Sequence, residues 1–295
     1  MPSNSIYPEQ RIPTQIQRTW NSFRENTLAM FALWCLVIII FITIFSPWIS
    51  PYGSQFKTGQ FLLPPSWDTR GSVDYFLGTD DLTRDMLSRL IVGSRLTFGY
   101  AISVTLSASG IGIFIGILAG MTSGLKSSFL NHILDTVLSI PSLLLAIIFV
   151  AFYGTGEFSI LLAVWLALIP RFIRSVYTAV HSEMGKEYVL SSRLDGENSF
   201  YLLYHSVLPN ILTILNTEVT RALSVATLDI AALGFLELGT SAPSPEWGTM
   251  LGTSIDLIFT APWTVTLPGL AIMISVLVVN IVGDGLTRAI NSGTE

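Results

Sequence analysis

The sequence predicts an all-α membrane protein with six transmembrane helices. Of its 295 residues, 51% are hydrophobic and only 12% are charged, and the mean hydropathy is +0.61. Soluble domains carry about 25% charged residues, and a soluble chain this apolar would expose large hydrophobic patches. Several apolar runs also approach the length of about 20 residues that a helix needs to cross a bilayer. Composition and run length together indicate a chain that crosses a membrane several times.

The first predicted span is Leu28 to Ile49, which follows a polar segment of residues 1–27. Its apolar core is too long for a signal peptide, and no A-x-A cleavage site follows it. We therefore interpret this run as an uncleaved transmembrane helix. Cys35, the one cysteine of the chain, lies inside it and cannot form an internal disulfide, so we expect it to be a packing residue.

Residues 50–95 interrupt the apolar pattern with aromatic residues, prolines and glycines. Thr79 or Asp80 is suited to cap a helix, and the pattern after them predicts an amphipathic helix that runs to about Val92. We expect this segment to lie outside the bilayer, between the first and second spans.

Five further apolar runs complete the six spans. Glycines dot the first of them, which suits close helix packing in lipid, and Pro141 breaks the second, which Asp135 enters. The third is predicted to end near Pro170. The five runs are Leu96–Met121 (with Gly110, Gly112, Gly116 and Gly120), Ile133–Phe152, Ser159 to about Phe172, Ile211–Leu236 and Trp263–Ile281.

The distribution of lysine and arginine predicts the orientation, because these residues accumulate on the cytoplasmic side. With the N-terminus in the cytoplasm, the five outer cations all lie within residues 50–95, and the other outer loops, 153–158 and 237–262, have none. Both termini and the polar stretch 186–210 are then cytoplasmic. Arg221 lies within a span and is not counted. The nine cytoplasmic cations are Arg11, Arg18, Arg24, Lys126, Arg171, Arg174, Lys186, Arg193 and Arg288.

The stretch 186–210 is polar and lies between long apolar runs. Glu187 is favoured in the first turn of a helix, where an acid meets the positive end of the helix dipole. Gly196 suits the end of that helix after two turns. A second short helix is predicted at Phe200–Val207, and Pro209 fits the first turn of the next helix. This pattern alone is also compatible with an ordinary solvated loop between two spans.

The same stretch resembles the EAA loop of ABC-transporter permeases, in the form E-Y-V-x-A-A-R-x-x-G with a later H-x-x-L-P-N that is typical of the peptide-transporter branch. Ser191 and Ser192 stand where the family usually has alanines, and serine preserves the small volume. The resemblance implies that this loop docks an ATPase subunit. The residues it assigns to ATPase coupling are Glu187, Tyr188, Ser191, Ser192, Arg193, Gly196 and Pro209.

Three other segments carry the resemblance further. Residues 77–90 match L-G-T-D-x-x-G-R-D-x-L-S-R-L, except that Thr83 replaces the glycine. Residues 245–251 resemble P-x-W-G-x-M-L, and residues 280–288 resemble N-x-x-G-D-G-L-R with one residue inserted. In the last segment we expect Asp284 to cap or tether the end of the final span. These matches favour the dipeptide and oligopeptide branch.

The resemblance covers about residues 28–290, and three short segments, 194–196, 228–234 and 244–248, most resemble the permeases of Sap peptide-transport systems. It implies the type I ABC importer permease fold, with an N-terminal part to residue 95 and a permease domain at 96–288. It also implies import of peptides, including antimicrobial peptides, across the bacterial inner membrane. The implied partners are a second homologous permease, two ATP-binding subunits that hold ATP and Mg²⁺, a periplasmic solute-binding protein and membrane lipid, without nucleic acid.

Ionisable residues within the spans are costly and are therefore candidates for function. Glu218, Arg221 and Asp229 of the fifth span, with Asn280 of the sixth, could line a polar path for a charged substrate. Alternatively, Glu218 and Arg221 form an internal ion pair that fastens helices, and Asp229 lies in water near the outer end. The family commonly has an acid before A-x-L-S-F-L-G-L-G. Here the acid is shifted by one position and Glu237 replaces a glycine, so no role is carried over to Asp229.

Catalysis by this chain is not expected. It lacks the G-x-x-x-x-G-K-[ST] loop that cradles a triphosphate, so any ATP hydrolysis must occur on partner subunits. No Ser/His/Asp or Cys/His arrangement has catalytic spacing, and His132, His181 and His205 are too scattered to suggest a metal site or a cofactor. The substrate stays open between peptide, haem and polyamine, including putrescine export. A stand-alone channel or secondary carrier is the alternative from another class, although the inverted repeats of many carriers are not visible.

Overall fold

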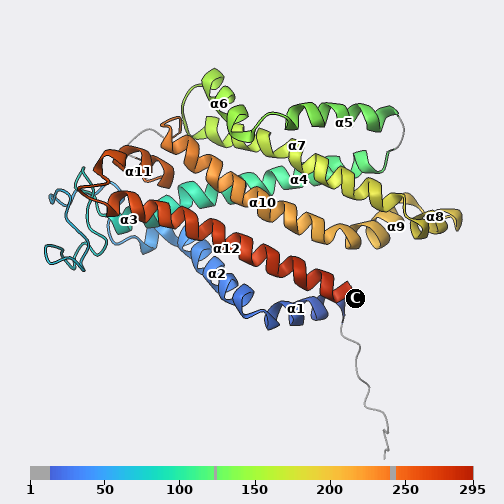
Figure 1. The fold of residues 1–295 in the computed structure, drawn as a ribbon, viewed down its shortest axis with the longest axis horizontal. Helices are drawn as coiled ribbons and strands as arrows, with labels where there is room; N and C mark the ends of the chain where they lie inside the picture. Colours follow the sequence, from blue (N-terminus) through green and yellow to red (C-terminus); the bar gives the residue numbers. More distant parts are fainter. Residues whose placement is uncertain (1–13, 123–124, 240–243, 295) are drawn as a thin grey trace, which may run out of the picture.

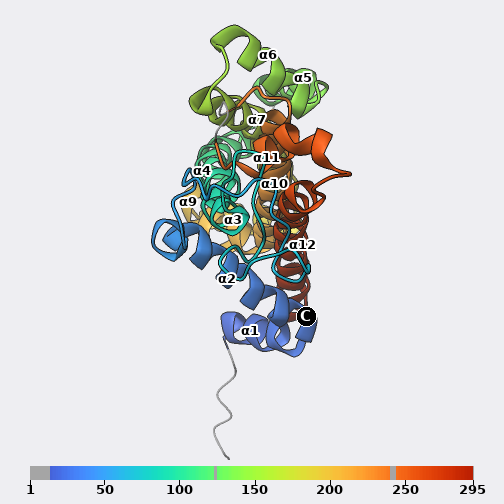
Figure 2. The ribbon, with the colours of Figure 1, turned by 90° about the vertical axis from the view of Figure 1, so that its left-hand side faces the viewer.

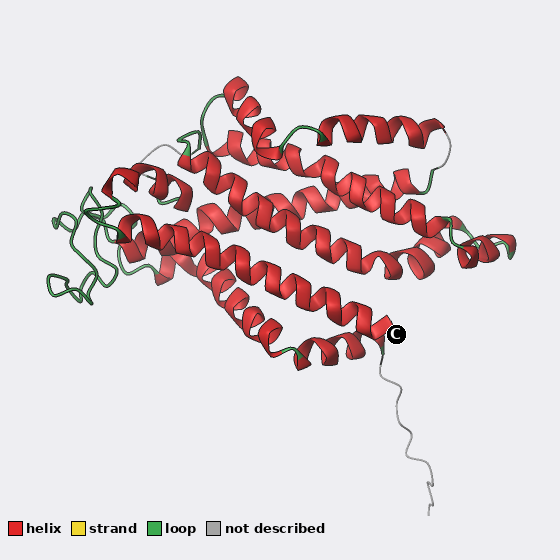
Figure 3. Cartoon of the chain, viewed as in Figure 1, coloured by secondary structure: helices red, strands yellow, loops and turns green. Residues whose placement is uncertain are grey.

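The computed structural model describes residues 14–122, 125–239 and 244–294, and its regular structure there is helical apart from two isolated β-bridges (Figures 1 and 3). The helices are α1 (Gln15–Glu25), α2 (Thr27–Ile49), α3 (Met86–Ser94), α4 (Tyr100–Gly120), α5 (Leu125–Leu138), α6 (Ser142–Tyr153), α7 (Glu157–Met184), α8 (Glu187–Leu194), α9 (Ser199–Leu202), α10 (Leu208–Phe235), α11 (Trp247–Ser254) and α12 (Trp263–Thr294).

Four helical segments are long and apolar enough to cross a bilayer: α2, the continuous pair α3–α4 (Met86–Gly120), α7 and α12. A fifth candidate is the pair α5–α6, which is bent by 82° at the break that Pro141 predicts. The predicted fifth span, α10, is a helix of 28 residues but is not among these candidates. Its polar and charged residues lower its mean hydropathy. The fold is thus an all-helical membrane protein with four or five candidate spans.

The bundle is packed most closely between α4 and α7, and α10 lies beside both (Figure 1). Three glycines of α4 face α7 so closely that an added Cβ would lie 2.3–2.7 Å from its side chains, which confirms the predicted use of small residues. Gly110 does not share this role, because nothing lies within 4 Å of its Cβ position. The three contact glycines are Gly112, Gly116 and Gly120.

The two ends of the bundle differ in character. One end carries α1, α8, α9 and the last turns of α12, and the other carries α3, α11 and the loop of residues 50–85 (Figure 1). Figure 2 shows α5 and α6 on one side of the bundle and α1 on the opposite side. Most of the segments that share one end are those that the charge distribution assigns to one face of the membrane, but Arg171 and Arg174, counted there as cytoplasmic, lie within α7 because that helix runs on past Pro170. Arg11 and the side chain of Lys126, which enter that assignment, lie outside the described residues.

The predicted cap of the outer helix is wrong. The helix begins at Met86, and its N-cap is Asp85, whose carboxylate accepts from the backbone N–H of Ser88 at 2.8 Å. Thr79 and Asp80 are instead occupied in the preceding turn, where Thr79 Oγ1 accepts from the N–H of Leu63 and Asp80 pairs with arginine. The predicted second span therefore starts ten residues earlier than Leu96, since α3 continues into α4 through a π-helical turn.

Two predicted helix ends are also wrong. Helix α7 does not stop near Phe172 but contains Pro170 and runs to Met184, because its buried face continues through Val176 and Val180. Helix α12 runs on beyond Ile281 to Thr294, where it packs against α1. Asp284 consequently lies inside a helix with its side chain exposed and does not cap the final span.

Candidate functional site

The stretch 186–210 forms two short helices that project from the end of the bundle (Figure 1). Glu187 lies in the first turn of α8, as predicted. Gly196 has φ +86°, and the N–H of Glu197 bonds to the carbonyl of Ser192 at 3.2 Å, which closes the helix in a Schellman motif. This left-handed conformation favours glycine. Pro209 lies in the first turn of α10, where its missing N–H costs nothing.

Tyr188 connects α8 to the ends of two long helices. Its hydroxyl donates to the carboxylate of Glu183 in the last turn of α7. It also accepts from Nδ2 of Asn210, at the start of α10, at 2.9 Å. Lys186 Nζ lies 2.7 Å from the other carboxylate oxygen of Glu183. We call Glu183, Lys186, Tyr188 and Asn210 the Tyr188 cluster.

The electrostatics of this cluster keep the phenol protonated. Glu183 is 6% exposed, so its charge depends on these partners for stabilisation. Partial burial, followed by the hydrogen bond to Glu183, raises the pKa of Tyr188 to about 12. Tyr188 therefore remains a hydrogen-bond donor to Glu183 at any physiological pH.

The two short helices have one buried and one exposed apolar face. Val189, Leu202 and Val207 are fully buried and pack against the cluster of apolar side chains at the end of α7. Leu194 and Phe200, by contrast, are 89% and 75% exposed. The exposed set, which we call the α8–α9 surface, consists of Leu190, Leu194, Phe200, Tyr201 and Tyr204.

Exposed apolar side chains grouped on a polar projection are typical of a protein-binding surface. The predicted residues Ser191 and Arg193 are exposed beside this surface, and Ser192 is half-buried. The sequence pattern assigned no contact to Phe200 or Tyr204. Their occurrence in an otherwise polar stretch is the signal that could have identified them.

The direct ion pair between Glu218 and Arg221, one of the two alternatives, is not formed among the described residues. The side chain of Arg221 is exposed. Glu218 is half-buried and lies within electrostatic range of Arg221 and, less strongly, of Arg171 on α7, and its buried Oε1 has no hydrogen-bond partner. A spacing of three residues permits a pair but does not orient the two side chains toward each other.

Asp229 is not in water, contrary to one of the two alternatives. It is 8% exposed, and its Oδ2 is buried without a hydrogen-bond partner. Ser142, in the first turn of α6, and Arg171 lie near its carboxylate. Glu218 and Asp229 are eleven residues apart and so share one face of α10, with Arg171 in range of both.

Asn280 lies apart from these acids and joins helices. Its Nδ2 donates to Ser224 Oγ of α10 at 2.9 Å and to the carbonyl of Val276 at 2.8 Å. Closer to the N-terminus of α10, Asn216 donates to Thr287 Oγ1 of α12 at 2.9 Å. Asn280 is thus one of a series of polar ties between α10 and α12, and among the described residues its side chain makes no hydrogen bond to Glu218, Arg221 or Asp229.

At the other end of the bundle, the segment 77–90 folds around Asp80. Arg84 Nε donates to Asp80 Oδ2 at 2.7 Å, and Arg89 Nε lies 3.6 Å from the same oxygen. Arg89 also donates to the carbonyl of Ser244, 155 residues away in sequence, at 3.0 Å. Thr83 has φ +61°, the left-handed conformation that the glycine of the family pattern would adopt without strain.

Glu246 fastens α11 to the bundle. Its carboxylate accepts from the N–H groups of Gly248 and Thr249 at 2.9 and 2.7 Å, and from Thr97 Oγ1 at 2.7 Å. Burial raises its pKa, although these donors oppose the shift. An added Cβ on Gly248 would lie 1.9 Å from the carbonyl oxygen of Ala231, so glycine is required where α11 meets α10.

Residues 112–295 match the protein family described as the binding-protein-dependent transport system inner membrane component. The chain belongs to this family. Residues 14–65 also match the N-terminal transmembrane domain of oligopeptide transport permease C. The resemblance to ABC permeases of the peptide branch is therefore confirmed, and the chain is a multi-pass inner-membrane permease component.

Full-length relatives of this permease family support the same placement. The chain is 55% identical over 296 residues to "Peptide transport system permease protein SapC" of Salmonella typhimurium strain LT2, with 100% of both chains covered. It is 41% identical over 280 residues to "Dipeptide transport system permease protein DppC" of Escherichia coli K12, covering 94% of this chain and 93% of that one.

A solved structure shows that the fold is shared more widely within permeases. The MetNI methionine ABC transporter in an inward-facing conformation contains a chain that matches 70% of this one and 97% of its own length, with a TM-score of 0.56 and 18% identity. At that identity the likeness concerns the fold alone. It supports an ABC importer permease architecture for the helices described above.

Proposed function

We propose that this chain is a permease subunit of an ATP-driven importer that moves peptides across the bacterial inner membrane. The relatives named above, 55% and 41% identical over almost their full length, are peptide and dipeptide permeases. In this proposal the chain pairs with a second, homologous permease, and each permease docks one ATP-binding subunit. A periplasmic binding protein delivers the substrate to the end formed by the 50–85 loop and α11.

The proposed topology has six spans with both termini in the cytoplasm. Helix α10 becomes the fifth crossing, because its charged face is turned toward α7 and α6 rather than toward lipid alone. The bent pair α5–α6 becomes the third crossing. An even number of crossings agrees with α1 and the end of α12 lying together (Figure 1). Two of the five outer arginines and lysines, Arg84 and Arg89, pair internally with Asp80, which sharpens the charge asymmetry.

The Tyr188 cluster is the observation that carries the proposal. An ATPase that docks on the α8–α9 surface would move α8, and α8 is hydrogen-bonded to both α7 and α10 through one hydroxyl. A displacement of the docked helices is then passed to two long helices of the bundle. In this proposal the partner subunits bind and hydrolyse ATP, and they can drive the permease only if their affinity differs between its two states.

The two acids of α10 provide the proposed polar path for substrate. Glu218 and Asp229 each keep a buried oxygen without a partner in the isolated chain. Arg171 lies within electrostatic range of both acids, and Arg221 within range of Glu218. An amino group of a peptide is a suitable partner for an unsatisfied carboxylate of this kind.

The test is co-purification of this chain with the proteins encoded beside it, comparing the wild type with Glu187→Arg and with bulky, charged substitutions at Gly196. We expect wild type to retain the ATPase and the second permease, and the position-187 variant to lose only the ATPase. The Gly196 variants should keep the second permease and lose peptide uptake, since residue 196 needs a positive φ. Normal peptide uptake with both positions substituted, or solute transport by the chain alone without ATP, would contradict the proposal.

A further inference from the structure

Helix α1 is a fixed part of the structure. Its C-cap region is joined to α12 through the hydroxyls of Ser22 and Ser292, which lie 2.6 Å apart. Phe23 is 2% exposed and packs against Ala29 and Ala289. Thr14 and Gln17 form a capping box that closes the first turn. The helix thus lies along the end of α12, next to the start of the span α2.

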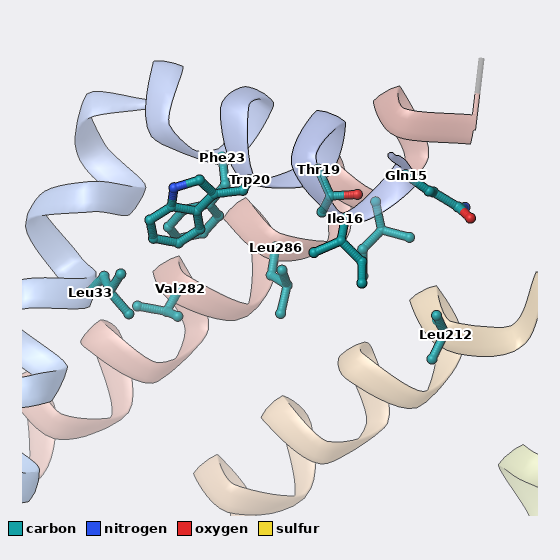
Figure 4. Close-up of a pocket in the computed structure, with 10 residues that line it drawn as sticks. Gln15, Ile16, Thr19, Trp20, Phe23, Leu33, Leu212, Val282 and Leu286 are labelled. Atoms are coloured by element: carbon teal, nitrogen blue, oxygen red, sulfur yellow. The ribbon is translucent and has the colours of Figure 1, made fainter. Parts of the chain in front are cut away.

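An apolar groove of about 420 Å³ lies between α1 and the bundle (Figure 4). Figure 4 shows Ile16 and Trp20 of α1 directed toward Val282 and Leu286 of α12, with Leu33 of α2 at one end and Leu212 of α10 at the other. The side chains of Ile16 and Trp20 are 82% and 51% exposed, so the groove is open on its outer side and a ligand can enter it.

Cations flank the side of α1 that lines the groove, because Arg18 lies three residues after Gln15 and Arg24 lies four residues after Trp20. Arg18 and Arg24 are both exposed, and Arg288 is exposed on the adjoining region of α12. Glu25 is the one acid within α1. An amphipathic helix with basic residues flanking an apolar side that holds Trp or Ile is suited to lie in the membrane interface, where anionic headgroups meet acyl chains.

We propose that this groove binds an acyl chain of an anionic phospholipid from the cytoplasmic leaflet, with the headgroup held by Arg18 and Arg24. The lining is apolar apart from Gln15 and Thr19, as an acyl chain requires, and Leu33 of the first predicted span lines one end of the groove. The proposal rests on the cytoplasmic orientation of the proposed function but not on ATPase coupling.

The test is native mass spectrometry of the full-length, delipidated chain titrated with phosphatidylglycerol or with phosphatidylcholine. We expect wild type to retain phosphatidylglycerol at least tenfold more readily than phosphatidylcholine. Ile16→Glu places a charge in the groove at an exposed position, so it should abolish retention of both lipids without unfolding the chain. The double variant Arg18→Gln, Arg24→Gln should reduce the preference to about twofold or less.

Two controls keep the result specific. Arg70→Gln removes an exposed arginine from the other end of the bundle and should leave the lipid preference unchanged, and Ile16→Leu should retain phosphatidylglycerol. Equal retention of the two lipids by wild type, or a preference that survives both test variants, would overturn the proposal. Cross-linking of an Ile16→Cys variant to the second permease in the assembled complex would also overturn it, because a protein would then fill the groove.

Discussion

Replacement of Tyr188 by phenylalanine isolates the role of one hydroxyl in linking α8 to the bundle. The ring keeps its packing, but the donor to Glu183 and the acceptor for Asn210 are both lost. A hydrogen bond to a charged group contributes about 1.5–3 kcal/mol, and Glu183 is almost completely buried. A loss of about 2 kcal/mol corresponds to roughly a thirtyfold rise in the local opening of α8.

The assay is amide hydrogen exchange in the assembled complex, followed at the α8 amides of Val189 and Leu190, which both bond to the carbonyl of Lys186. We expect exchange of these amides to accelerate roughly thirtyfold in Tyr188→Phe. Peptide-stimulated ATPase activity should fall while the ATPase still co-purifies, in contrast to Glu187→Arg. Tyr153→Phe is the matched control, since Tyr153 is exposed at the end of α6, outside the α8–α9 surface, and no hydrogen bond of its hydroxyl is seen among the described residues.

The same cluster predicts a dependence on pH. Because the pKa of Tyr188 is raised from 10.0 to about 12, the folded state holds the phenol proton more tightly than the unfolded state. The contribution to stability is complete below pH 10 and is lost as the pH rises toward 12. A spectrophotometric titration should show one tyrosine of pKa about 12 that is absent from Tyr188→Phe. For Tyr188→Phe, exchange rates of the α8 amides within twofold of wild type, together with normal peptide-stimulated ATPase activity, would refute the proposed link between α8 and the bundle.

Three further predictions concern the other end of the bundle. Thr83→Gly and Glu237→Gly each place glycine at a positive φ, +61° and +58°, and should slow local exchange about fivefold, since strain of about 1–2 kcal/mol exceeds the entropic cost of glycine. Glu246→Gln removes an acceptor for the first N–H groups of α11, and exchange of its first-turn amides should rise about tenfold or more. Asp80→Asn removes a buried carboxylate that pairs with both Arg84 and Arg89, at a cost of about 3–5 kcal/mol, so limited proteolysis should cut the 50–85 loop at lower protease concentration. Unchanged cleavage in this last variant would show that the arginine pairs do not hold the loop.

Features set by local chemistry could be predicted from the sequence. Gly196 and Pro209 mark the end of one helix and the start of another, and each depends on its own backbone geometry. The break at Pro141 follows in the same way. Helix ends that depend on distant packing could not be predicted. Pro170 removes one hydrogen bond from α7, but the buried face that continues beyond it outweighs that loss.

The candidate site shows the same difference between features set by local sequence and features set by contacts with distant residues. Tyr188 was identified because it lies in the EAA-type pattern. Its partner Glu183 could not be identified, because it lies in the last turn of α7, beyond the predicted end of that span near Phe172. Spacing alone suggested that Glu218 and Arg221 could pair; the two side chains make no direct ion pair, and Arg171 of α7 also lies within electrostatic range of Glu218. Partners on different helices cannot be derived from separations along one helix.

Helix α10 is the element that can carry a displacement from one end of the molecule to the other. Asn210 ties its first turn to α8, Asn216 ties it to α12, and Gly248 brings α11 against its last turns. A helix held at so many points moves with its neighbours or not at all, because packed cores do not deform continuously. The start of α6 is different, since it meets the unsatisfied carboxylate of Asp229 beside the 82° bend. A substrate group that hydrogen-bonds to Asp229 would therefore act on the bent pair α5–α6. Since Asp229 and Asn210 both belong to α10, this helix would link the proposed polar path to the Tyr188 cluster.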